Sequence, residues 1–583
     1  SEREPGKRFT KLWRVMTSKE WLIHAWQRIE GNKGSHTAGI DNETADDISC
    51  SRIVALSERL RAGTYKPKAV RRVYIPKGNG KRRPLGIRTI EDRIVQQALR
   101  MLLEPIFEAD FLDCSHGFRK HRSTHTALRE VAVNFPRTSW TVEGDIVGCF
   151  DNIPHEKLVK AVSRRVADGK ILSLIRRFLK AGYMEDWMYH RTYSGTPQGG
   201  VISPLLCNIF LHALDDFMVR ELGANRRQTS KDSYARKTHD YKTTSRELWK
   251  RRVKLRRACR SERRQLLAEV KELEKLQKRT PCYDKRHPAK FGYVRYADDF
   301  VILVNGTRAD AEAVKAQVAD KLKTLGLELS EEKTTVTHWR NKFTFLGFNI
   351  QGRMRKKGVQ IKAIFSIPNE NFRRIRREIE KVCSYHHIPE ADAMARVSLM
   401  YRGWCNYYRF ASGPQTVFSR LSYFAWWQFA HFLARKHQTS IAQVIRRAKR
   451  SGRLKSVTVQ GRQLQTFAMQ VGKQKLILNI VPPKTGSIWN VPKPANWNGD
   501  QMPPAMTNWA KGRSLETQLT AKGRTGGLCE RCGQRPVFEV HHRRPMRGKS
   551  LRGRVTSDAA QRQTAVGLCL KCRAAAHGYR AAG

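Results

Sequence analysis

Two adjacent aspartates, Asp298 and Asp299, stand between two segments that favour β-strands. Residues 291–296 are rich in aromatic and β-branched side chains, and residues 300–304 form an uninterrupted apolar run. This pattern predicts a β-hairpin that carries two carboxylates at its tip. Because neighbouring carboxylates repel each other, the pair favours a compensating cation, and hard oxygen ligands select Mg²⁺ or Mn²⁺. A solvated hairpin turn is the alternative that these residues alone leave open.

A third acid, Asp145, follows another strand-like segment, residues 140–144. Sites that bind two metal ions draw their carboxylates from more than one backbone element. We therefore expect Asp145 to lie beside Asp298 and Asp299 and to complete a site for two Mg²⁺ ions. Asp151, a few residues beyond the strand, is a competing candidate for the third acid.

The chain carries a large excess of positive charge. Its 583 residues include 111 Lys and Arg but only 52 Asp and Glu, a net charge of +59. Such an excess predicts a large polyanion as partner. No segment approaches the roughly 18 apolar residues that span a membrane, and the first residues show no signal-peptide pattern. We therefore expect no membrane partner and an intracellular location, either the bacterial cytoplasm or an organelle.

Shifts in composition predict five regions. Residues 221–290 hold 23 Lys and Arg against 9 Asp and Glu in a helix-favouring pattern, which fits either a solvated helix or phosphate contact. Basic and aromatic residues interleave after residue 363, which fits either a nucleic-acid groove or a helical core. The expected regions are an N-terminal extension (1–65), an alternating strand-and-helix region (66–362) with the basic insertion (221–290), a helical region (363–470), a Pro-containing linker (471–523) and a small terminal module (524–583).

Four of the twelve cysteines form two Cys-x-x-Cys pairs near the end of the chain. Each such pair makes a knuckle, and tetrahedral Zn²⁺ binds two of them, so the spacing predicts a structural zinc site. In a module of this size the metal would supply much of the folding energy. The other eight cysteines are scattered singly, and we expect no disulfides. The expected zinc ligands are Cys529, Cys532, Cys569 and Cys572.

Seven sequence blocks follow one another along the chain, within residues 71–87, 115–119, 145–153, 195–205, 296–299, 326–334 and 345–348. In this order they resemble the motifs of the reverse transcriptases of mobile group II introns, a family also called maturases. The resemblance implies an α+β right-hand polymerase with fingers and palm at residues 66–362. It also implies a helical thumb and maturase X domain at residues 363–470, followed by a DNA-binding linker region.

The resemblance also assigns roles to single residues. Asp145 and the hairpin acids would bind Mg²⁺ at the polymerase site. Lys77 and Arg83 would hold the triphosphate of the incoming dNTP, where negative charge develops on the leaving group. Phe150 would exclude a ribose 2′-hydroxyl, and Gln198 would lie in the nucleotide pocket, beside glycines that allow close backbone approach.

The terminal module resembles the HNH (ββα-metal) endonucleases that many of these proteins carry. In that family the first histidine of a pair and a later histidine bind a catalytic divalent ion, while the second of the pair activates water. The resemblance assigns metal binding to His541 and His577 and the general-base role to His542. The chain departs from the pattern at Arg573, where the family has His, and at Thr564, where an Asn is expected.

Together these features predict an RNA-directed DNA polymerase and intron maturase that acts in a ribonucleoprotein. Its expected partners are a group II intron RNA, target DNA and dNTPs, and its expected metals are Mg²⁺ and Zn²⁺. Target-primed reverse transcription and nicking of DNA by the terminal module would follow. Two alternatives stay open: an RNA-binding splicing factor with vestigial enzymatic sites, and a reverse transcriptase of another retroelement.

Overall fold

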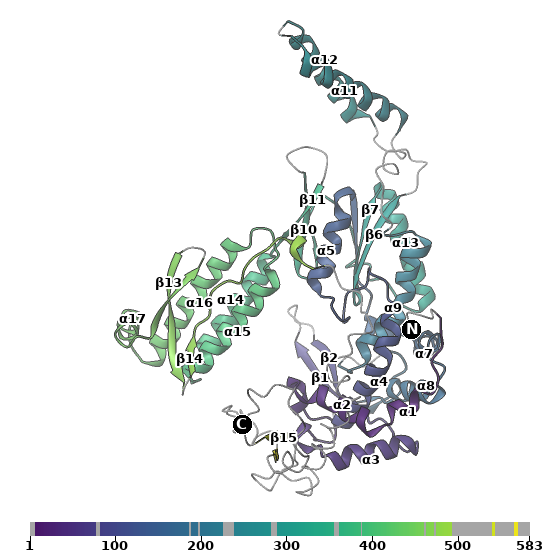
Figure 1. Ribbon diagram of the computed structural model, residues 1–583, viewed down its shortest axis with the longest axis vertical. Helices are drawn as coiled ribbons and strands as arrows, with labels where there is room; N and C mark the ends of the chain where they lie inside the picture. Colours follow the sequence, from purple (N-terminus) through teal and green to yellow (C-terminus); the bar gives the residue numbers. More distant parts are fainter. Residues whose placement is uncertain are drawn as a thin grey trace, which may run out of the picture.

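The computed structural model combines helices and sheets in three parts (Figure 1). These are a body (residues 6–225 and 289–366), a side lobe (residues 369–477) and a projecting arm (residues 239–279). No described helix is long and apolar enough to cross a membrane. The described residues are 6–76, 82–185, 188–195, 199–225, 238–259, 261–280, 289–354, 361–385, 387–459, 462–471, 474–492, 539–542 and 565–568.

A four-stranded antiparallel sheet lies at the centre of the body, in the order β6-β7-β3-β8. The predicted hairpin is confirmed, because the two segments that flank the aspartates pair with each other. The strand expected before Asp145 is also present and pairs with the hairpin's second strand. The strands are β3 (Trp140–Gly144), β6 (Lys290–Tyr296), β7 (Asp299–Asn305) and β8 (Thr335–His338).

Strand β7 is buried on both faces, which explains its continuous apolar sequence. Because side chains alternate along a strand, its residues contribute to two different cores. Phe300, Ile302 and Val304 pack in the core of the body with helices α9 (Ser203–Asp216) and α13 (Arg308–Leu325). Val301 and Leu303 belong to a second core, which also contains residues of α5 (Thr124–Asn134) and of the side lobe.

Helix α4 is the central helix of the lower body and is buried along most of its length. The N-terminal helices pack in the same core, and the indole Nε1 of Trp21 donates a hydrogen bond to the Ala98 carbonyl at 3.0 Å. The N-terminal region is therefore part of the body's core. These helices are α1 (Leu12–Met16), α2 (Lys19–Glu30), α3 (Cys50–Arg61) and α4 (Ile90–Glu108).

A second four-stranded sheet, in the order β2-β1-β4-β5, stands beside this helical core. Its long pair, β1 and β2, is antiparallel, and β1 pairs in parallel with β4. Short helices connect it to the central sheet. These elements are β1 (Val70–Pro76), β2 (Arg82–Ile87), β4 (Tyr183–Glu185), β5 (Met188–His190), α6 (Cys149–Asn152), α7 (His155–Ser163) and α8 (Gly169–Leu179).

The side lobe begins with the helices that the sequence predicts but ends in a three-stranded sheet. The expectation of helix up to residue 470 is wrong for this sheet, whose strands contain many basic and polar side chains and so resemble in composition the helices before them. The lobe consists of α14 (Asn369–Ser384), α15 (Glu390–Tyr408), α16 (Gln415–Lys436), α17 (Ile441–Arg450), β12 (Leu454–Val459), β13 (Arg462–Val471) and β14 (Gln474–Ile477).

A small antiparallel sheet, in the order β11-β10-β9, joins the body to the lobe, and two helices form the arm. Near the end of the chain β15 and β16 pair antiparallel, with His541 opposite Val566. The elements are β9 (Phe343–Phe345), β10 (Phe348–Met354), β11 (Ile361–Ser366), α11 (His239–Arg257), α12 (Arg263–Arg279), β15 (Glu539–His542) and β16 (Ala565–Leu568).

Candidate active site

The turn between β6 and β7 places two acids at the end of the central sheet. Tyr296 pairs with Asp299, so only Ala297 and Asp298 form the turn. Ala297 adopts the left-handed region with φ 57°. An alanine there carries strain on the order of 1 kcal/mol, which neighbouring contacts must offset. The turn is thus held in a conformation that its own sequence does not prefer.

Asp145 lies next to this turn because of the strand register. Gly144 pairs with Phe300 across β3 and β7, so Asp145 and Asp299 extend from neighbouring positions at the same end of the sheet. The Phe300 ring fills the space over Gly144, where an added methyl carbon would be only 2.1 Å from a ring atom. The structure therefore brings the three acids predicted from the sequence to one edge.

The two hairpin carboxyl groups, Asp298 and Asp299, have raised pKa values. Burial of the carboxyl group, then the charges of Asp298 and Asp145, raise the pKa of Asp299 from 3.8 to about 6. Burial and the Asp145 charge also raise the pKa of Asp298. The Asp299 residue as a whole is exposed, so solvent moderates these effects. The edge of the sheet is a concentration of negative charge that favours a cation.

Lys333 supplies one such positive charge. Its Nζ lies 2.5 Å from Oδ2 of Asp145, and this contact raises the pKa of the Lys333 ammonium. Backbone hydrogen bonds align the segment before it, since Ser330 N–H donates to the Asp145 carbonyl at 2.8 Å and Val147 N–H to the Glu328 carbonyl at 2.9 Å. The chain segment that carries Lys333 therefore runs alongside Asp145.

The donor chemistry of this edge fits Mg²⁺, because all three side chains are carboxylates. Within the described residues, however, no three His, Cys, Asp or Glu side chains converge as ready-made metal ligands. The Lys333 ammonium, which is 69 % exposed, is the cation that contacts Asp145 in this structure.

A buried ion pair supports the turn from below. Arg295 and Asp215 are both fully buried, and the guanidinium donates to both carboxylate oxygens, from Nε at 2.7 Å and from Nη2 at 2.5 Å. Nη1 donates to the Ala297 carbonyl at 2.8 Å and to Asn208 Oδ1 at 3.1 Å, and Nη2 also donates to Ser115 Oγ at 2.9 Å. All three guanidinium nitrogens are therefore satisfied, and one of these bonds fixes the strained turn residue.

The turn also touches the backbone of residues 115–117. Backbone bonds join Arg295 N–H to the Cys114 carbonyl at 2.8 Å and His116 N–H to the Arg295 carbonyl at 2.9 Å. A methyl group added at Gly117 would lie 2.4 Å from the Ala297 nitrogen, so only glycine allows this approach. The hairpin is thus clamped between this segment and helix α9.

The structure describes only part of the predicted nucleotide site. Arg83 is exposed on β2, and its charge acts to lower the pKa of Asp298. Phe150 is buried in α6. Gly199, at φ 103°, closely approaches strand β2, where an added methyl carbon would lie 2.8 Å from the Gly86 carbonyl oxygen. Lys77 and Gln198 lie outside the described residues.

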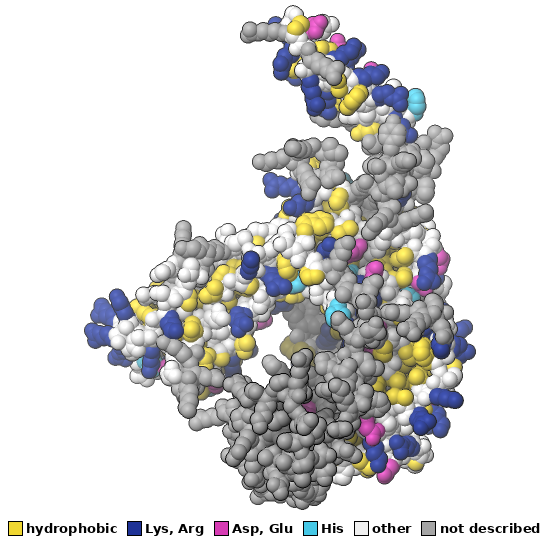
Figure 2. Space-filling view, in the orientation of Figure 1, with side chains coloured by type: hydrophobic (Ala, Val, Ile, Leu, Met, Phe, Trp, Pro, Cys, Tyr) yellow, Lys and Arg dark blue, Asp and Glu magenta, His cyan; other side chains and the backbone are white. Residues whose placement is uncertain are grey.

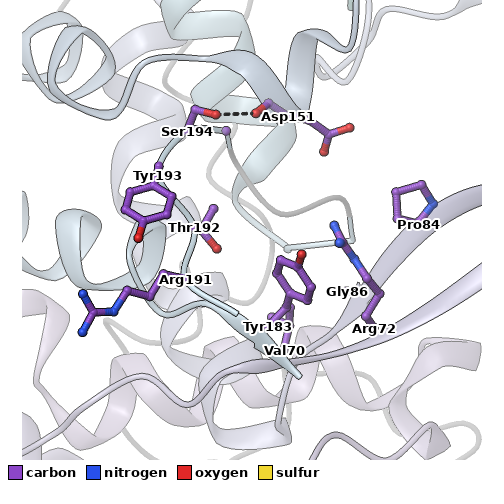
Figure 3. A pocket seen from close by; sticks show the side chains of 11 residues that line it. Val70, Arg72, Pro84, Gly86, Asp151, Tyr183, Arg191, Thr192, Tyr193 and Ser194 are labelled. Atoms are coloured by element: carbon purple, nitrogen blue, oxygen red, sulfur yellow. Dashed lines mark hydrogen bonds between the residues drawn. The ribbon is translucent and has the colours of Figure 1, made fainter. Parts of the chain in front are cut away.

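A pocket of about 240 Å³ opens beside α6, between the β1–β2 sheet and the loop after β5 (Figure 3). The Arg72 guanidinium lies 3.7 Å from the centre of the Tyr183 ring, and Ser194 Oγ donates to the Asp151 carbonyl at 3.0 Å. Asp151, the competing candidate for the third acid, is exposed and lines this pocket. Tyr193, also on the lining, is 83 % exposed.

Sequence reasoning did not identify Lys333, Arg295 or Asp215 as parts of this site. A single arginine inside the otherwise apolar β6 was the available signal, because a buried guanidinium requires an acidic partner. In the terminal module, the described backbone of β15 includes His541 and His542, but their side chains are not described. Cys529, Cys532, Cys569, Cys572 and His577 lie outside the described residues.

Two protein families match this chain. The reverse transcriptase (RNA-dependent DNA polymerase) family matches residues 75–224 and 270–350, and thus includes all three acids and Lys333. The maturase-specific domain of group II introns matches residues 372–451, the helical part of the side lobe. The body and the lobe thus correspond to different families.

A relative similar over nearly the whole chain decides the assignment. Group II intron-encoded protein LtrA of Lactococcus lactis is 34 % identical over 606 aligned residues, which cover 97 % of this chain and 95 % of that protein. The chain belongs to the group II intron-encoded proteins. It has a reverse transcriptase domain with a palm-and-fingers fold and a group II intron maturase domain, which imply binding of intron RNA.

Two further relatives match this intron-encoded protein over different shares of their length. Protein YkfC of Escherichia coli is 35 % identical, covering 64 % of this chain and 90 % of that protein. The putative COX1/OXI3 intron 2 protein of Saccharomyces cerevisiae is 28 % identical, covering 92 % of this chain and 62 % of that protein. The maturase match is not expected of reverse transcriptases from other retroelements, so that alternative is disfavoured.

We expect Arg295→Met to destabilise the protein by about 3–5 kcal/mol, because it leaves the buried Asp215 carboxylate without a compensating positive charge and with only the hydrogen bond from the Tyr293 hydroxyl, at 3.2 Å. The double variant Arg295→Met/Asp215→Leu removes both charges and is expected to lose less free energy of unfolding than the single variant. Urea unfolding followed by fluorescence measures both. If the single and double variants lost the same free energy of unfolding, the uncompensated charge of Asp215 would not be the cause of the destabilisation.

The raised pKa of Asp299 predicts a pH-dependent stability without divalent ions. The folded state binds this proton more tightly than the unfolded state, so stability falls as pH rises from 3.8 to about 6. In Asp299→Asn this contribution disappears, so between about pH 4 and 6 the melting temperature of the variant should fall less, or rise more, with pH than that of the wild type. Thermal melts in EDTA test this, and identical slopes for the two proteins would contradict it.

Proposed function

We propose that Asp145, Asp298 and Asp299 bind the Mg²⁺ ions of an RNA-templated DNA polymerase. The observation that carries this proposal is the strand register that sets Asp145 beside the hairpin acids, at an edge where burial and neighbouring carboxylates raise the pKa values of Asp298 and Asp299. Reverse transcriptase domains generally use Mg²⁺, which would activate the attacking 3′-hydroxyl and neutralise charge on the triphosphate. Clamping of the turn by Arg295 keeps the acids in place.

Nucleotide binding is proposed for four residues around these acids. Lys77 and Arg83 hold the triphosphate, and the effect of Arg83 on the pKa of Asp298 supports a position near the acids. Phe150 crowds the sugar and selects deoxynucleotides, while Gln198 lines the nucleotide pocket. Gly199 supports this arrangement by letting the loop before α9 approach strand β2.

The intron-encoded protein is proposed to act in a ribonucleoprotein with its intron RNA. There the maturase domain helps the RNA adopt its splicing-competent fold, and the polymerase extends a target DNA strand that has been cut. The net charge of +59 supports binding of both nucleic acids. Because the RNA performs splicing, this second activity requires binding energy and no catalytic side chains.

The terminal module, residues 524–583, is proposed to bind zinc and to nick the target DNA. Cys529, Cys532, Cys569 and Cys572 have the spacing of a structural Zn²⁺ site. His542 is the proposed general base, with His541 and His577 on a catalytic divalent ion. Four thiolates already complete a tetrahedral Zn²⁺ site, which leaves the histidines for a second metal ion.

Primer extension on an RNA template with Mg²⁺ tests the polymerase proposal. Asp298→Asn is expected to lower the rate by about a thousandfold or more, because it removes a carboxylate that would hold the Mg²⁺ ions that stabilise the transition state. Glu331→Gln neutralises an exposed acid in the segment that carries Lys333 and serves as the matched control. Lack of synthesis by the wild type, or equal rates for the two variants, would contradict the proposal.

Zinc content and DNA nicking test the terminal module separately. The purified protein should contain one Zn²⁺ per chain, and Cys532→Ser should lose it, since four thiolates form a closed tetrahedral site. In the ribonucleoprotein, His542→Ala should abolish Mg²⁺-dependent nicking while zinc is retained. Nicking that survives this substitution would remove His542 from the proposed role.

A further inference from the structure

We propose that the arm docks on the intron RNA through its exposed basic side chains and Trp249. The arm lies outside the maturase-specific match, and the reverse transcriptase match omits residues 225–269, which include all of α11. The identity of the RNA rests on the assignment of the chain to the intron-encoded proteins. Trp249 and all basic residues on α11 lie outside both matches, whereas the end of α12, from residue 270, falls within the reverse transcriptase match.

The described chain before the arm ends against the strand that follows the arm. Asn225, before the arm, donates its backbone N–H to the Phe291 carbonyl at 2.9 Å. Its side-chain amide donates to the Tyr293 carbonyl at 2.7 Å and accepts the Tyr293 N–H at 2.8 Å. The chain therefore leaves and re-enters the body at adjacent positions, and Figure 1 shows α11 and α12 extending beyond the end of β6 and β7.

The arm is an internally bonded helical hairpin. Leu248 and Val270 are buried within it, at 3 % and 8 % exposure. Ion pairs join the helices, from Arg251 to Glu269 at 3.1 Å and from Arg252 to Glu274 at 2.6 Å. Two further acids, Glu247 and Glu272, pair with lysines on their own helices, so most of the arm's acids are engaged inside it.

The remaining charge on the arm is strongly positive. Residues 239–279 contain 15 Lys and Arg against 6 Asp and Glu, a net charge of +9. Several exposed basic residues make no ion pair with the described part of the chain, and Figure 2 shows the dark blue side chains on this arm. These residues are Arg246, Lys254, Arg256, Arg263, Arg264 and Lys271.

An exposed tryptophan distinguishes this surface from a merely solvated charged helix. Trp249 is 66 % exposed and stands between basic residues on α11. A flat ring beside Lys and Arg suits an unpaired base that stacks while its phosphates are neutralised. Folded RNA offers such bases in loops and bulges, whereas the bases of duplex DNA are stacked inside the helix. The chemistry therefore favours structured RNA.

Binding of the intron RNA transcribed from around this reading frame tests the proposal. The variant Arg246→Gln/Lys254→Gln/Arg256→Gln is expected to bind about tenfold or more weakly, with a salt dependence reduced by about two to three phosphate contacts. A control variant, Lys160→Gln/Arg164→Gln/Lys170→Gln, removes as many exposed charges from helices α7 and α8 of the body. It should retain clearly more affinity than the arm variant.

Trp249→Ala tests the stacking contact independently of charge. Its affinity for the same RNA is expected to fall about tenfold, and Trp249→Phe should restore most of it because a smaller ring still stacks. Circular dichroism melts of each variant verify that the arm and body stay folded. Replacing the chain between Asn225 and Phe291 by a short Gly-Ser linker should lower the RNA affinity about as much as the charge and Trp249 substitutions do together.

The outcomes separate this proposal from the polymerase proposal. Primer extension on a short unstructured template should be unchanged in the arm variants, and a loss there would overturn a pure docking role. Wild-type RNA affinity in the arm variants would also overturn the proposal, as would weakened binding to duplex DNA with RNA binding intact. If the wild type fails to extend primers but the arm variants still lose RNA affinity, only the polymerase proposal fails.

Discussion

The buried ion pair between Arg295 and Asp215 is the interaction on which the candidate site depends. Burying two charges is costly, and an apolar pair of the same size is often as stable, so stability alone does not account for it. The geometry of the guanidinium does, because the same group that satisfies Asp215 also holds the Ala297 carbonyl. The ion pair thus fixes a turn whose backbone would otherwise relax, and with it the direction of Asp298.

In this intron-encoded protein the candidate site is acidic, whereas the chain as a whole is basic. At the edge of the central sheet, three acids gather where Lys333 and Arg83 supply nearby positive charge. Over the whole chain the balance is reversed, with a net charge of +59. A small acidic site within a basic molecule suits chemistry in which a polyanion is held by its backbone while metal ions are concentrated at one point.

The sequence predicted what depends on local periodicity and missed what depends on distant contacts. The hairpin and the strand before Asp145 were predictable, because apolar and β-branched runs have few alternatives to buried strands. The partner of Arg295 lies 80 residues away, and Lys333 reaches an acid 188 residues away, so no local pattern reveals either contact. The strands after α17 were missed because their many basic and polar side chains give a weak strand signal after long basic helices.

Strand β7 contributes side chains to two hydrophobic cores. One face packs with the helices of the body, and the other belongs to the same apolar cluster as the helices of the maturase domain. Close-packed interiors transmit displacement and resist sliding. The maturase lobe and the strand that begins with Asp299 therefore share one continuous apolar core, so a substitution that disturbs this core is expected to affect both the lobe and the candidate site.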